Sequence, residues 1–351
     1  MAKNIVVCFD GTGNEVKARG ATNIFKIVEL LDLTDAARQI AYYDPGVGTF
    51  ASPRAWTAAA RALSRLGGLA LGHGIRQNLG EAYAFLMNNW KPGDKVFVFG
   101  FSRGAYTARA LCGMLYRVGL LRPSSENLVP YALRVYARRP GKGSDLSGPE
   151  GWDRMDRFAE ALSVPVRAGS LAFPVAFLGL FDTVKATGVL GRDIHWPYTN
   201  QLTNVAVVRH AVSIDEKRRP YQECLIPSPS SGKGPAVTES WFAGVHSDVG
   251  GGFDDHAELG RISIRWMIEG AIDEGLFIRP MRYKRRYPAR ETDAYGPIHV
   301  MGRAWALAGY RRRTVPPGAR VHASVRERIR KDTTYSEKIP VDAVWDEDAW
   351  P

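Results

Sequence analysis

The chain has 351 residues, of which 45% are hydrophobic and 24% are charged, a composition typical of a globular protein with room for one or two domains. It contains no run of about 18 apolar residues, and its three cysteines, Cys8, Cys112 and Cys224, form no C-x-x-C pair. These features disfavour a membrane-spanning helix, a disulfide framework and a cysteine zinc site, and we expect the cysteines to be small buried hydrophobes.

The formal net charge of +11 comes from one segment, because residues 281–331 hold 14 Lys or Arg against 3 Asp or Glu. Such a tract can attract the phosphates of anionic lipids or of nucleic acid, but a run of charge more often forms a solvated face. We expect a peripheral contact with an anionic membrane at most, and no nucleic-acid partner.

Residues 5–9 are too short for the apolar core of a secretory signal, so we expect a cytoplasmic protein unless a signal-independent system exports it. The oligomeric state stays open.

Apolar, β-branched runs alternate with helical patterns from residue 3 to about residue 270. The expected strands, in chain order, are residues 3–9, 39–43, 95–101, 173–181 and 240–245. The expected helices are residues 24–33, 75–90, 104–118 and 204–216. The last of these rests on Val205, Val208 and Val212, which recur at a helical spacing. The alternation predicts an α/β fold, with a mostly parallel sheet and helices on both faces.

Two segments interrupt this alternation, and a third follows it. Residues 55–72, rich in Ala and Leu, fit a surface helix or a flap, and residues 122–170, rich in Pro, Gly and charge, fit an insertion over the carboxyl edge of the sheet. Both are candidates for lids that shape a substrate pocket. We expect one catalytic domain over residues 1–280, with the basic extension 281–351 packed on it.

A G-x-S-x-G pattern, Gly100 to Gly104 with Ser102 at its centre, follows the clearest strand and opens a helix. The pattern has a mechanical reason, because a strand that turns sharply into a helix crowds the turn, and glycines keep it free of side chains. A serine hydroxyl is a weak nucleophile near neutral pH and needs an adjacent base, which in turn needs a carboxylate to orient it. The sequence must therefore supply one histidine and one acid.

Among the seven histidines, His246 has the context expected of the base. It follows the expected strand 240–245 and precedes three consecutive glycines, residues 250–252, at the edge where α/β sheets place functional groups. His210 lies in the expected helix 204–216 and is interpreted as a core residue. The remaining five are in loops or polar surroundings: His73, His195, His256, His299 and His322.

Asp182 is the first choice for the acid, because it follows the expected strand 173–181 and gives the chain order Ser, Asp, His of α/β-hydrolases. Asp215 is the alternative acid, although its place near the end of the expected helix also fits an ion pair there. The backbone donors expected to stabilise an oxyanion are the amide of Arg103 and that of Gly11 or Thr12.

Two readings involving ions remain open. Residues 10–14 resemble a phosphate or metal loop but lack the Lys and Ser/Thr of a P-loop. Four acids follow strands and are suitable ligands for a divalent cation, although such acids are also common by chance: Asp10, Asp44, Asp182 and Asp248. We predict no cofactor and no metal.

Four blocks together give the chain a family resemblance: residues 9–14, 100–109, 181–184 and 242–252, with weaker matches at 210–218 and 322–328. On these blocks the sequence resembles bacterial α/β-hydrolases related to the catalytic domain of type VI secretion phospholipase effectors, long catalogued as a domain of unknown function. The likeness covers about residues 3–340, except for residues 122–170. It implies a triad at Ser102, Asp182 and His246, and phospholipase activity in the characterised effectors.

The chain departs from this family pattern in two ways. We see no membrane-docking or secretion-adaptor domain, which leaves both a lipid ester and a housekeeping ester as substrate. There is also no room before residue 3 for the two strands that usually precede the oxyanion-hole strand, so we expect a sheet trimmed at that edge. The favoured function is a serine hydrolase of carboxylic esters acting through an acyl-enzyme. The alternatives are a non-catalytic module that binds anionic lipid or nucleic acid, and a metal-dependent phosphoesterase.

Overall fold

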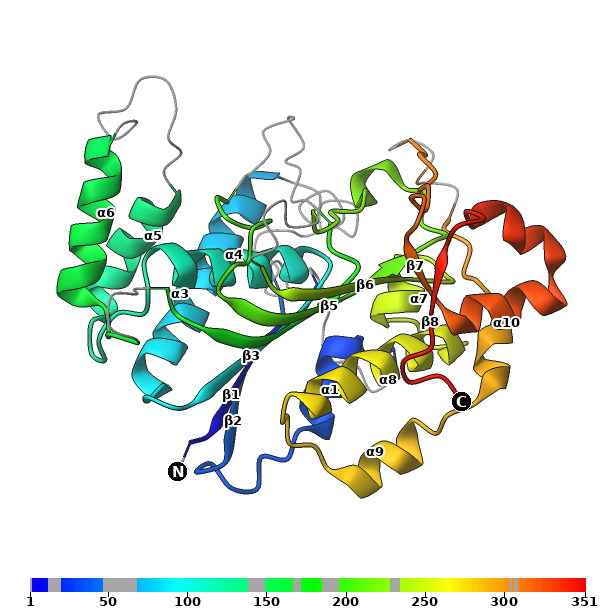
Figure 1. Ribbon diagram of the computed structural model, residues 1–351, viewed down its shortest axis with the longest axis horizontal. Coiled ribbons are helices and arrows are strands. Elements are labelled where there is room, and N and C mark those ends of the chain that lie inside the picture. Colours follow the sequence, from blue (N-terminus) through cyan, green and yellow to red (C-terminus); the bar gives the residue numbers. More distant parts are fainter. Residues whose placement is uncertain are drawn as a thin grey trace, which may run out of the picture.

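A single eight-stranded sheet runs through the computed structural model, with its strands in the order β2-β1-β3-β4-β5-β6-β7-β8. The structure describes residues 2–11, 20–46, 68–137, 149–166, 172–184, 196–227, 234–302, 305 and 309–351. Every neighbouring pair of strands is parallel (Figure 1). The strands are β1 (Asn4–Phe9), β2 (Gln39–Asp44), β3 (Lys95–Phe101), β4 (Val175–Phe181), β5 (Val205–Ser213), β6 (Ala236–Phe242), β7 (Arg320–His322) and β8 (Val344–Asp346). The predicted α/β class with a mostly parallel sheet is confirmed.

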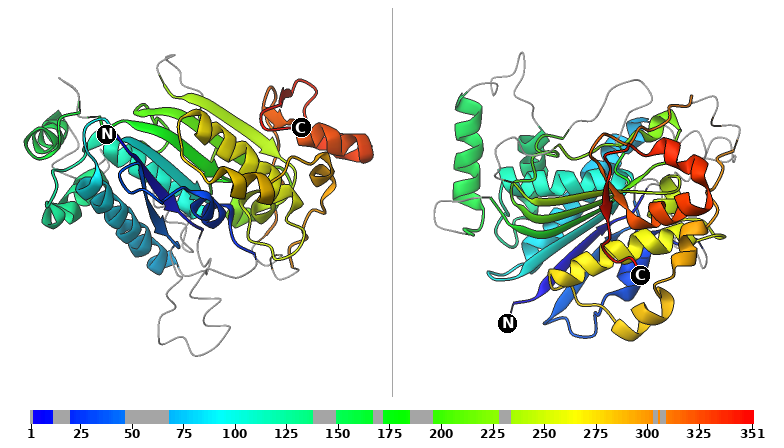
Figure 2. Two further views of the ribbon diagram at one scale, coloured as in Figure 1. Left: turned by 90° about the horizontal axis from the view of Figure 1, so that it is seen from below. Right: turned by 45° about the vertical axis from the view of Figure 1, so that its right-hand side comes forward.

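Helices cover both faces of this sheet, as predicted (Figures 1 and 2). Those of eight or more residues are α1 (Asn23–Leu30), α3 (Gly68–Asn89), α4 (Arg103–Arg117), α5 (Val129–Ala137), α6 (Pro149–Leu162), α8 (Glu258–Asp273) and α10 (Ala323–Lys331). Two shorter ones are α7 (His246–Gly250) and α9 (Pro280–Arg286). No helix among the described residues is long and apolar enough to cross a membrane.

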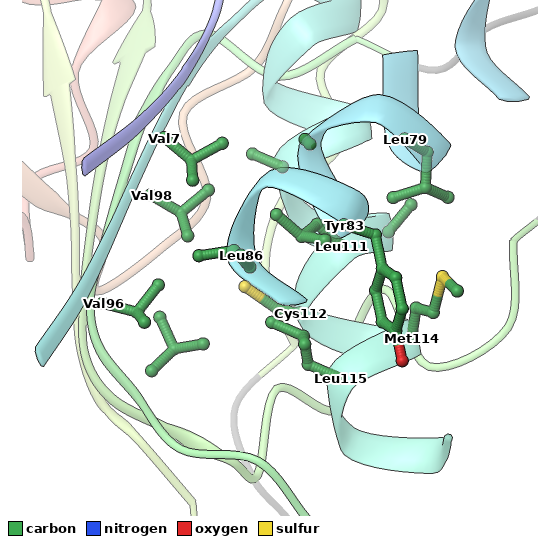
Figure 3. Packing of buried hydrophobic residues seen from close by; sticks show 14 of the residues in the cluster. Val7, Leu79, Tyr83, Leu86, Val96, Val98, Leu111, Cys112, Met114 and Leu115 are labelled. Atoms are coloured by element: carbon green, nitrogen blue, oxygen red, sulfur yellow. The ribbon is translucent and has the colours of Figure 1, made fainter. Parts of the chain in front are cut away.

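The two faces of the sheet bury alternate residues of the same strands, as the two-residue period of a strand requires. On one face, Val7, Val96 and Val98 point toward α3 and α4 (Figure 3). On the other face, side chains such as Phe97 and Phe99 pack with α1 and α8. Strands buried on both faces explain why these runs are apolar almost throughout.

The three cysteines are buried and unbonded, as predicted. Burial raises the pKa of the Cys112 thiol to about 12, and it also raises the pKa of Cys8. A thiol reacts as the thiolate, so both side chains behave as small apolar groups.

The prediction of a helix over residues 204–216 is wrong, because Val205–Ser213 forms the buried strand β5. Val205, Val208 and Val212 recur at a helical spacing, but Val207 is a fourth valine in the same segment. β-Branched residues such as valine favour a strand. A strand buried on both faces shows no polar alternation, so its spacing imitates a helix. The last expected strand is also displaced, since β6 ends at Phe242 and His246 opens α7 after a short turn.

The connections of β1 and β3 lead in opposite directions along the sheet, and α/β sheets bind ligands at such a point. From β1 the chain moves outward to β2, and from β3 it moves in the opposite direction to β4, so neighbouring strands β1 and β3 diverge in their connections. A ligand site is expected just beyond their carboxyl ends. The residues that follow those ends are Asp10 and Ser102.

The segments expected to cover the sheet lie partly outside the described residues. Most of residues 55–72 is not described, and the remainder begins α3. Within residues 122–170, α5 packs on α3 and α4, and Leu121 bridges Ser163 beyond the end of α4. The described part of this insertion therefore covers a helix layer rather than the carboxyl edge of the sheet. From the C-terminal segment, β7 and β8 join the sheet at the edge opposite β2 (Figure 1).

Candidate active site

Ser102 lies in the sharp turn between β3 and α4, with φ 60° and ψ −123°. A residue with a side chain rarely adopts this region, and such strain is held only where surrounding bonds fix the backbone. Here the Ser102 amide donates to the Phe181 carbonyl at 3.0 Å, and the Val184 amide donates to the Ser102 carbonyl at 3.5 Å. The turn is thus fastened to the residues on both sides of Asp182.

The glycines of the pattern are required by close backbone contacts. A Cβ at Gly100 would lie 2.5 Å from the Ala105 Cα, and a Cβ at Gly104 would lie 2.4 Å from the Phe9 carbonyl oxygen. Both distances are shorter than real Cβ atoms show, and both neighbours are backbone atoms. The predicted mechanical reason for G-x-S-x-G is therefore present in this turn.

His246 and Asp182 are in direct contact, with His246 Nδ1 2.5 Å from Asp182 Oδ2. The His246 ring is buried and contacts two aromatic rings. Its centre lies 4.6 Å from the centre of the Phe101 ring and 4.9 Å from the centre of the Tyr221 ring. Phe101 precedes Ser102, so the ring of His246 packs beside the strand that ends at Ser102. Of the two acids proposed from the sequence, Asp182 is the one that contacts the imidazole.

The electrostatics of this pair fix the tautomer of His246. Burial by itself raises the pKa of Asp182, but the Arg313 guanidinium and the hydrogen bond to His246 hold it well below its usual range. Burial lowers the pKa of His246, although the hydrogen bond to Asp182 opposes that shift. An ionised Asp182 accepts a hydrogen bond, so neutral His246 carries its proton on Nδ1 and leaves Nε2 as an acceptor.

Arg313 is a functional residue that sequence reasoning missed. Its Nη1 donates to Asp182 Oδ1 at 2.5 Å and its Nη2 donates to Asp182 Oδ2 at 3.0 Å. The Ser213 amide adds a third donor, at 2.9 Å from Oδ1. Arg313 lies 131 residues beyond Asp182 in a tract of several arginines, and nothing in its local sequence distinguishes it from its neighbours.

Asp215 lies apart from the imidazole, bound to three other groups. It accepts from the Gly244 amide at 2.7 Å, the Tyr335 hydroxyl at 2.6 Å and Lys338 Nζ at 2.5 Å. Because 205–213 is a strand rather than part of a helix, Asp215 belongs to the loop after β5. It ties that loop to the C-terminal segment.

A second carboxylate approaches His246 from its backbone side. Glu216 accepts from the His246 amide at 3.2 Å and holds Arg218 through two side-chain bonds of 2.9 and 2.7 Å. The Arg218 guanidinium lies 3.7 Å from the centre of the Tyr221 ring and 4.9 Å from that of Trp305. These aromatic and cationic groups form one wall beside the His246 ring.

The expected oxyanion donors differ in availability. The Arg103 amide is in the first turn of α4, where N–H groups have no partner within the helix. The Gly11 amide donates to Asp10 Oδ1 at 2.6 Å and would have to leave that bond to reach a substrate. Thr12 lies outside the described residues.

The other strand-end aspartates considered as metal ligands are bound to separate donors. Asp10 accepts from the hydroxyls of Thr22 and Tyr43, Asp44 from the Asn78 amide, and Asp248 from the Val245 amide and the His299 ring. Within the described part of the chain, no group of three or more His, Cys, Asp or Glu residues is arranged to hold a metal ion. His210 is buried in β5, where its Nε2 accepts from the Thr183 amide, as suits a core residue.

The chain was compared with protein families and with individual relatives. The family model described as "T6SS, Phospholipase effector Tle1-like, catalytic domain" matches residues 3–270. The chain is 36% identical over 232 residues to the uncharacterized protein YEL023C of Saccharomyces cerevisiae, a match that covers 65% of this chain and 33% of the yeast protein. The chain thus spans about a third of the length of that relative.

Two solved structures are also similar. One is the crystal structure of an uncharacterized protein from Pseudomonas aeruginosa, with a TM-score of 0.46 and 19% identity, covering 79% of this chain and 46% of that one. The other is the structure of the Tle1 effector bound to the VgrG spike from the Type 6 secretion system. Its TM-score is 0.34 and its identity 21%, with 72% of this chain and 51% of that one covered.

Proposed function

Because the chain belongs to the family of type VI secretion Tle1-like phospholipase effectors, through their catalytic domain, we propose that it hydrolyses carboxylic esters of phospholipids with Ser102 as nucleophile. The observation that carries the proposal is the contact of 2.5 Å between His246 Nδ1 and Asp182. Ser102, held at φ 60° at the carboxyl end of the sheet, is hydrogen-bonded through its backbone to Phe181 and Val184, on either side of Asp182. A nucleophile, a base and a group that orients the base are the parts that acyl transfer needs.

In the proposed reaction, Ser102 Oγ bonds to the ester carbonyl carbon while its proton passes to His246 Nε2. The tetrahedral intermediate then expels the alcohol, which takes that proton, and the acyl group stays on Ser102. Water repeats both steps: its oxygen bonds to the acyl carbon, His246 carries the proton, and the fatty acid leaves with Ser102 restored. Asp182 keeps its charge throughout and stabilises the imidazolium.

The developing oxyanion needs backbone donors that are already in place. The Arg103 amide fits this role, because it opens α4 and the positive end of the helix dipole favours negative charge there. The second donor remains the amide of Gly11 or Thr12, as expected from the sequence; the Gly11 amide donates to Asp10, and Thr12 lies outside the described residues.

Arg103 also supports a phosphate-bearing substrate. Burial lowers the pKa of its guanidinium, and the group that opposes this shift is the Tyr221 phenol rather than a carboxylate. Within the described part of the chain no carboxylate forms an ion pair with Arg103, and a partly desolvated cation of this kind beside Ser102 suits the phosphate of a lipid head group. We therefore propose a phospholipid as the substrate and a fatty acid as a product. Any export of the protein is likewise a proposal.

A fluorophosphonate probe tests the nucleophile. We expect labelling of the wild-type protein, complete loss in Ser102→Ala, and labelling slowed by at least about a hundredfold in His246→Ala, because the serine then has no base. Ser247→Ala is the matched control, since it removes a hydroxyl beside His246 that the proposal does not use. Equal labelling of the wild type and Ser102→Ala would refute the proposal.

The same proteins separate the other functions considered. Hydrolysis of a phosphate ester that is unchanged by Ser102→Ala but abolished by EDTA would select a metal-dependent phosphoesterase. Salt-sensitive binding of anionic vesicles without turnover by any variant would select a non-catalytic binding module.

A further inference from the structure

We propose that Arg313, supplied by the C-terminal segment, is a positioning residue that fixes Asp182 and weakens His246 as a base. The inference rests on the proposed function of His246. It concerns a part of the chain beyond residues 3–270, which the family model covers. Arg313 acts through Asp182 and does not itself touch the reacting atoms.

The first argument is the completeness of the contact. Arg313 binds both oxygens of Asp182 in the parallel, two-pronged arrangement that gives an arginine and a carboxylate their most specific geometry. Its nitrogens also donate to the Ser213 carbonyl at 3.0 Å, to the Ser213 hydroxyl at 2.7 Å and to the Tyr221 carbonyl at 2.6 Å. The side chain is 2% exposed, so the guanidinium has one orientation and Asp182 has one orientation with it.

The second argument is distance. Arg313 Nη2 and His246 Nδ1 lie 3.0 and 2.5 Å from the same oxygen, Asp182 Oδ2. The two nitrogens are therefore at most 3.0 + 2.5 = 5.5 Å apart. At such a separation, with both side chains buried, the positive charge of Arg313 disfavours the imidazolium of His246 and should lower its pKa by about one to two units.

The third argument is the balance of charges that face His246. Asp182, after β4, and Glu216, after β5, favour the imidazolium, whereas Arg218 disfavours it. We expect Arg313 to act in the same sense as Arg218, because its Nη2 binds the same Asp182 oxygen as the imidazole. The Tyr221 ring packs against the imidazole, and Asp248, on the same helix α7, is engaged by the Val245 amide and by His299. Asp182 and Glu216 thus each pair with an arginine. Arg313 offsets Asp182, the acid that contacts the ring, and its Nε also lies 3.3 Å from Glu223 Oε2.

The chemical consequence is a base that returns its proton easily. His246 must take a proton from Ser102 and then give it to the departing alcohol, so a strongly stabilised imidazolium would slow the second transfer. Arg313 lets Asp182 orient the ring without this excess stabilisation. Removing the Arg313 charge should raise the pKa of His246, so that the neutral base is lost at a higher pH as the solution is acidified.

The test measures the pKa of His246 directly, by NMR titration of protein labelled with ¹³C-histidine, with His246→Asn to identify its signal. We expect the pKa to rise by about one to two units in Arg313→Gln and to stay within about 0.3 units of wild type in Arg312→Gln. Arg312 is the matched control because it is the exposed neighbour in sequence. The acid limb of kcat/KM for a neutral ester should move with the pKa, and its plateau should fall about tenfold in Arg313→Gln. An unshifted His246 pKa in Arg313→Gln would overturn the inference.

Two further variants keep the test decisive. Arg313→Lys keeps the charge but cannot bind both oxygens, so we expect a His246 pKa close to wild type together with a lower plateau. If Arg313→Gln does not fold, Asp182→Asn is compared with the double variant Asp182→Asn/Arg313→Gln, in which both buried charges are gone. His246 should then titrate higher in the double variant, and equal values would overturn the inference. The titration needs no activity, so a failure of the proposed hydrolase function, seen with Ser102→Ala, remains distinguishable from a failure here.

Discussion

Asp182 is the residue on which the site depends, because three side chains or backbone groups converge on its two oxygens. It sits at φ 41°, in a region that side chains rarely adopt, and it is completely buried. Such a conformation persists only when its surroundings determine it fully. Here the Ser213 amide, Arg313 and His246 do so together. A buried carboxylate held by this many donors is a stable support for a catalytic imidazole.

Arg103 offers a test of substrate class at the scale of one side chain. In Arg103→Gln the backbone amide stays in place, so turnover of a neutral short-chain ester should change by less than about threefold. Hydrolysis of a phospholipid should fall by about ten- to a hundredfold, because a charge-assisted bond to phosphate is lost. The two rates are measured on the same preparation, with release of fatty acid from mixed micelles as the phospholipid assay.

Arg219→Gln serves as the control for that comparison, because Arg219 is an exposed arginine in the short turn that carries Tyr221. It should lower neither rate. An equal loss on both substrates in Arg103→Gln would contradict a role in binding phosphate and would point to damage to the turn.

At the scale of elements, the turn from β3 into α4 carries Ser102, the proposed nucleophile, and has no room for a larger side chain at its glycines. Gly104→Ala would place a Cβ 2.4 Å from the Phe9 carbonyl oxygen, and overpacking of this kind costs about 1–3 kcal/mol. We expect urea unfolding to show a loss of stability of that size, together with loss of activity. Gly302→Ala is the control, because no atom of the described residues lies within 4 Å of its added Cβ, and its stability should match the wild type.

The elements also show what the sequence could and could not predict. The strands ending at Phe9, Asp44, Phe101 and Phe181 were recognisable because apolar runs stop at turn-forming residues, and the parallel sheet follows from their alternation with helices. Strand β5 was mistaken for a helix because burial on both faces removes the polar alternation that marks a strand. The family predicted from the motifs is confirmed by the match over residues 3–270.

Contacts across long sequence separations were beyond such reasoning. The acid could be narrowed to Asp182 or Asp215 from the sequence, but only packing brings Asp182 to His246 and sends Asp215 to Tyr335. Arg313 had no local signal, because its partner is set by the position of the whole C-terminal segment. Patterns of neighbouring residues predict which helices and strands form, whereas the site depends on contacts between elements that are far apart in the sequence.

At the scale of the whole molecule, the C-terminal segment is built into the sheet and into the site. Its strands β7 and β8 continue the sheet from β6, and His322 stacks on Phe242 with ring centres 4.6 Å apart. Trp266 of α8 donates to Asp346 at 3.1 Å. Some of its positive charge is used internally, since Arg282 and Arg286 both pair with Glu29. Some basic residues of the C-terminal segment therefore stabilise the fold by pairing with acidic residues of the rest of the chain.

This integration predicts that a chain ending at residue 280 will not reach the native state. The segment buries Val315, Val321, Val325 and Tyr335 in the core shared with α1 and α8, and each such side chain contributes about 1.5–3 kcal/mol. Their sum is comparable with the whole stability of a typical protein, about 5–15 kcal/mol. We expect the truncated protein to bind a hydrophobic dye, to lose its near-UV circular dichroism and to unfold without a cooperative transition. A truncated protein with a native spectrum and a melting temperature equal to that of the full chain would show instead that the first 280 residues fold independently, with the C-terminal segment as an appendage.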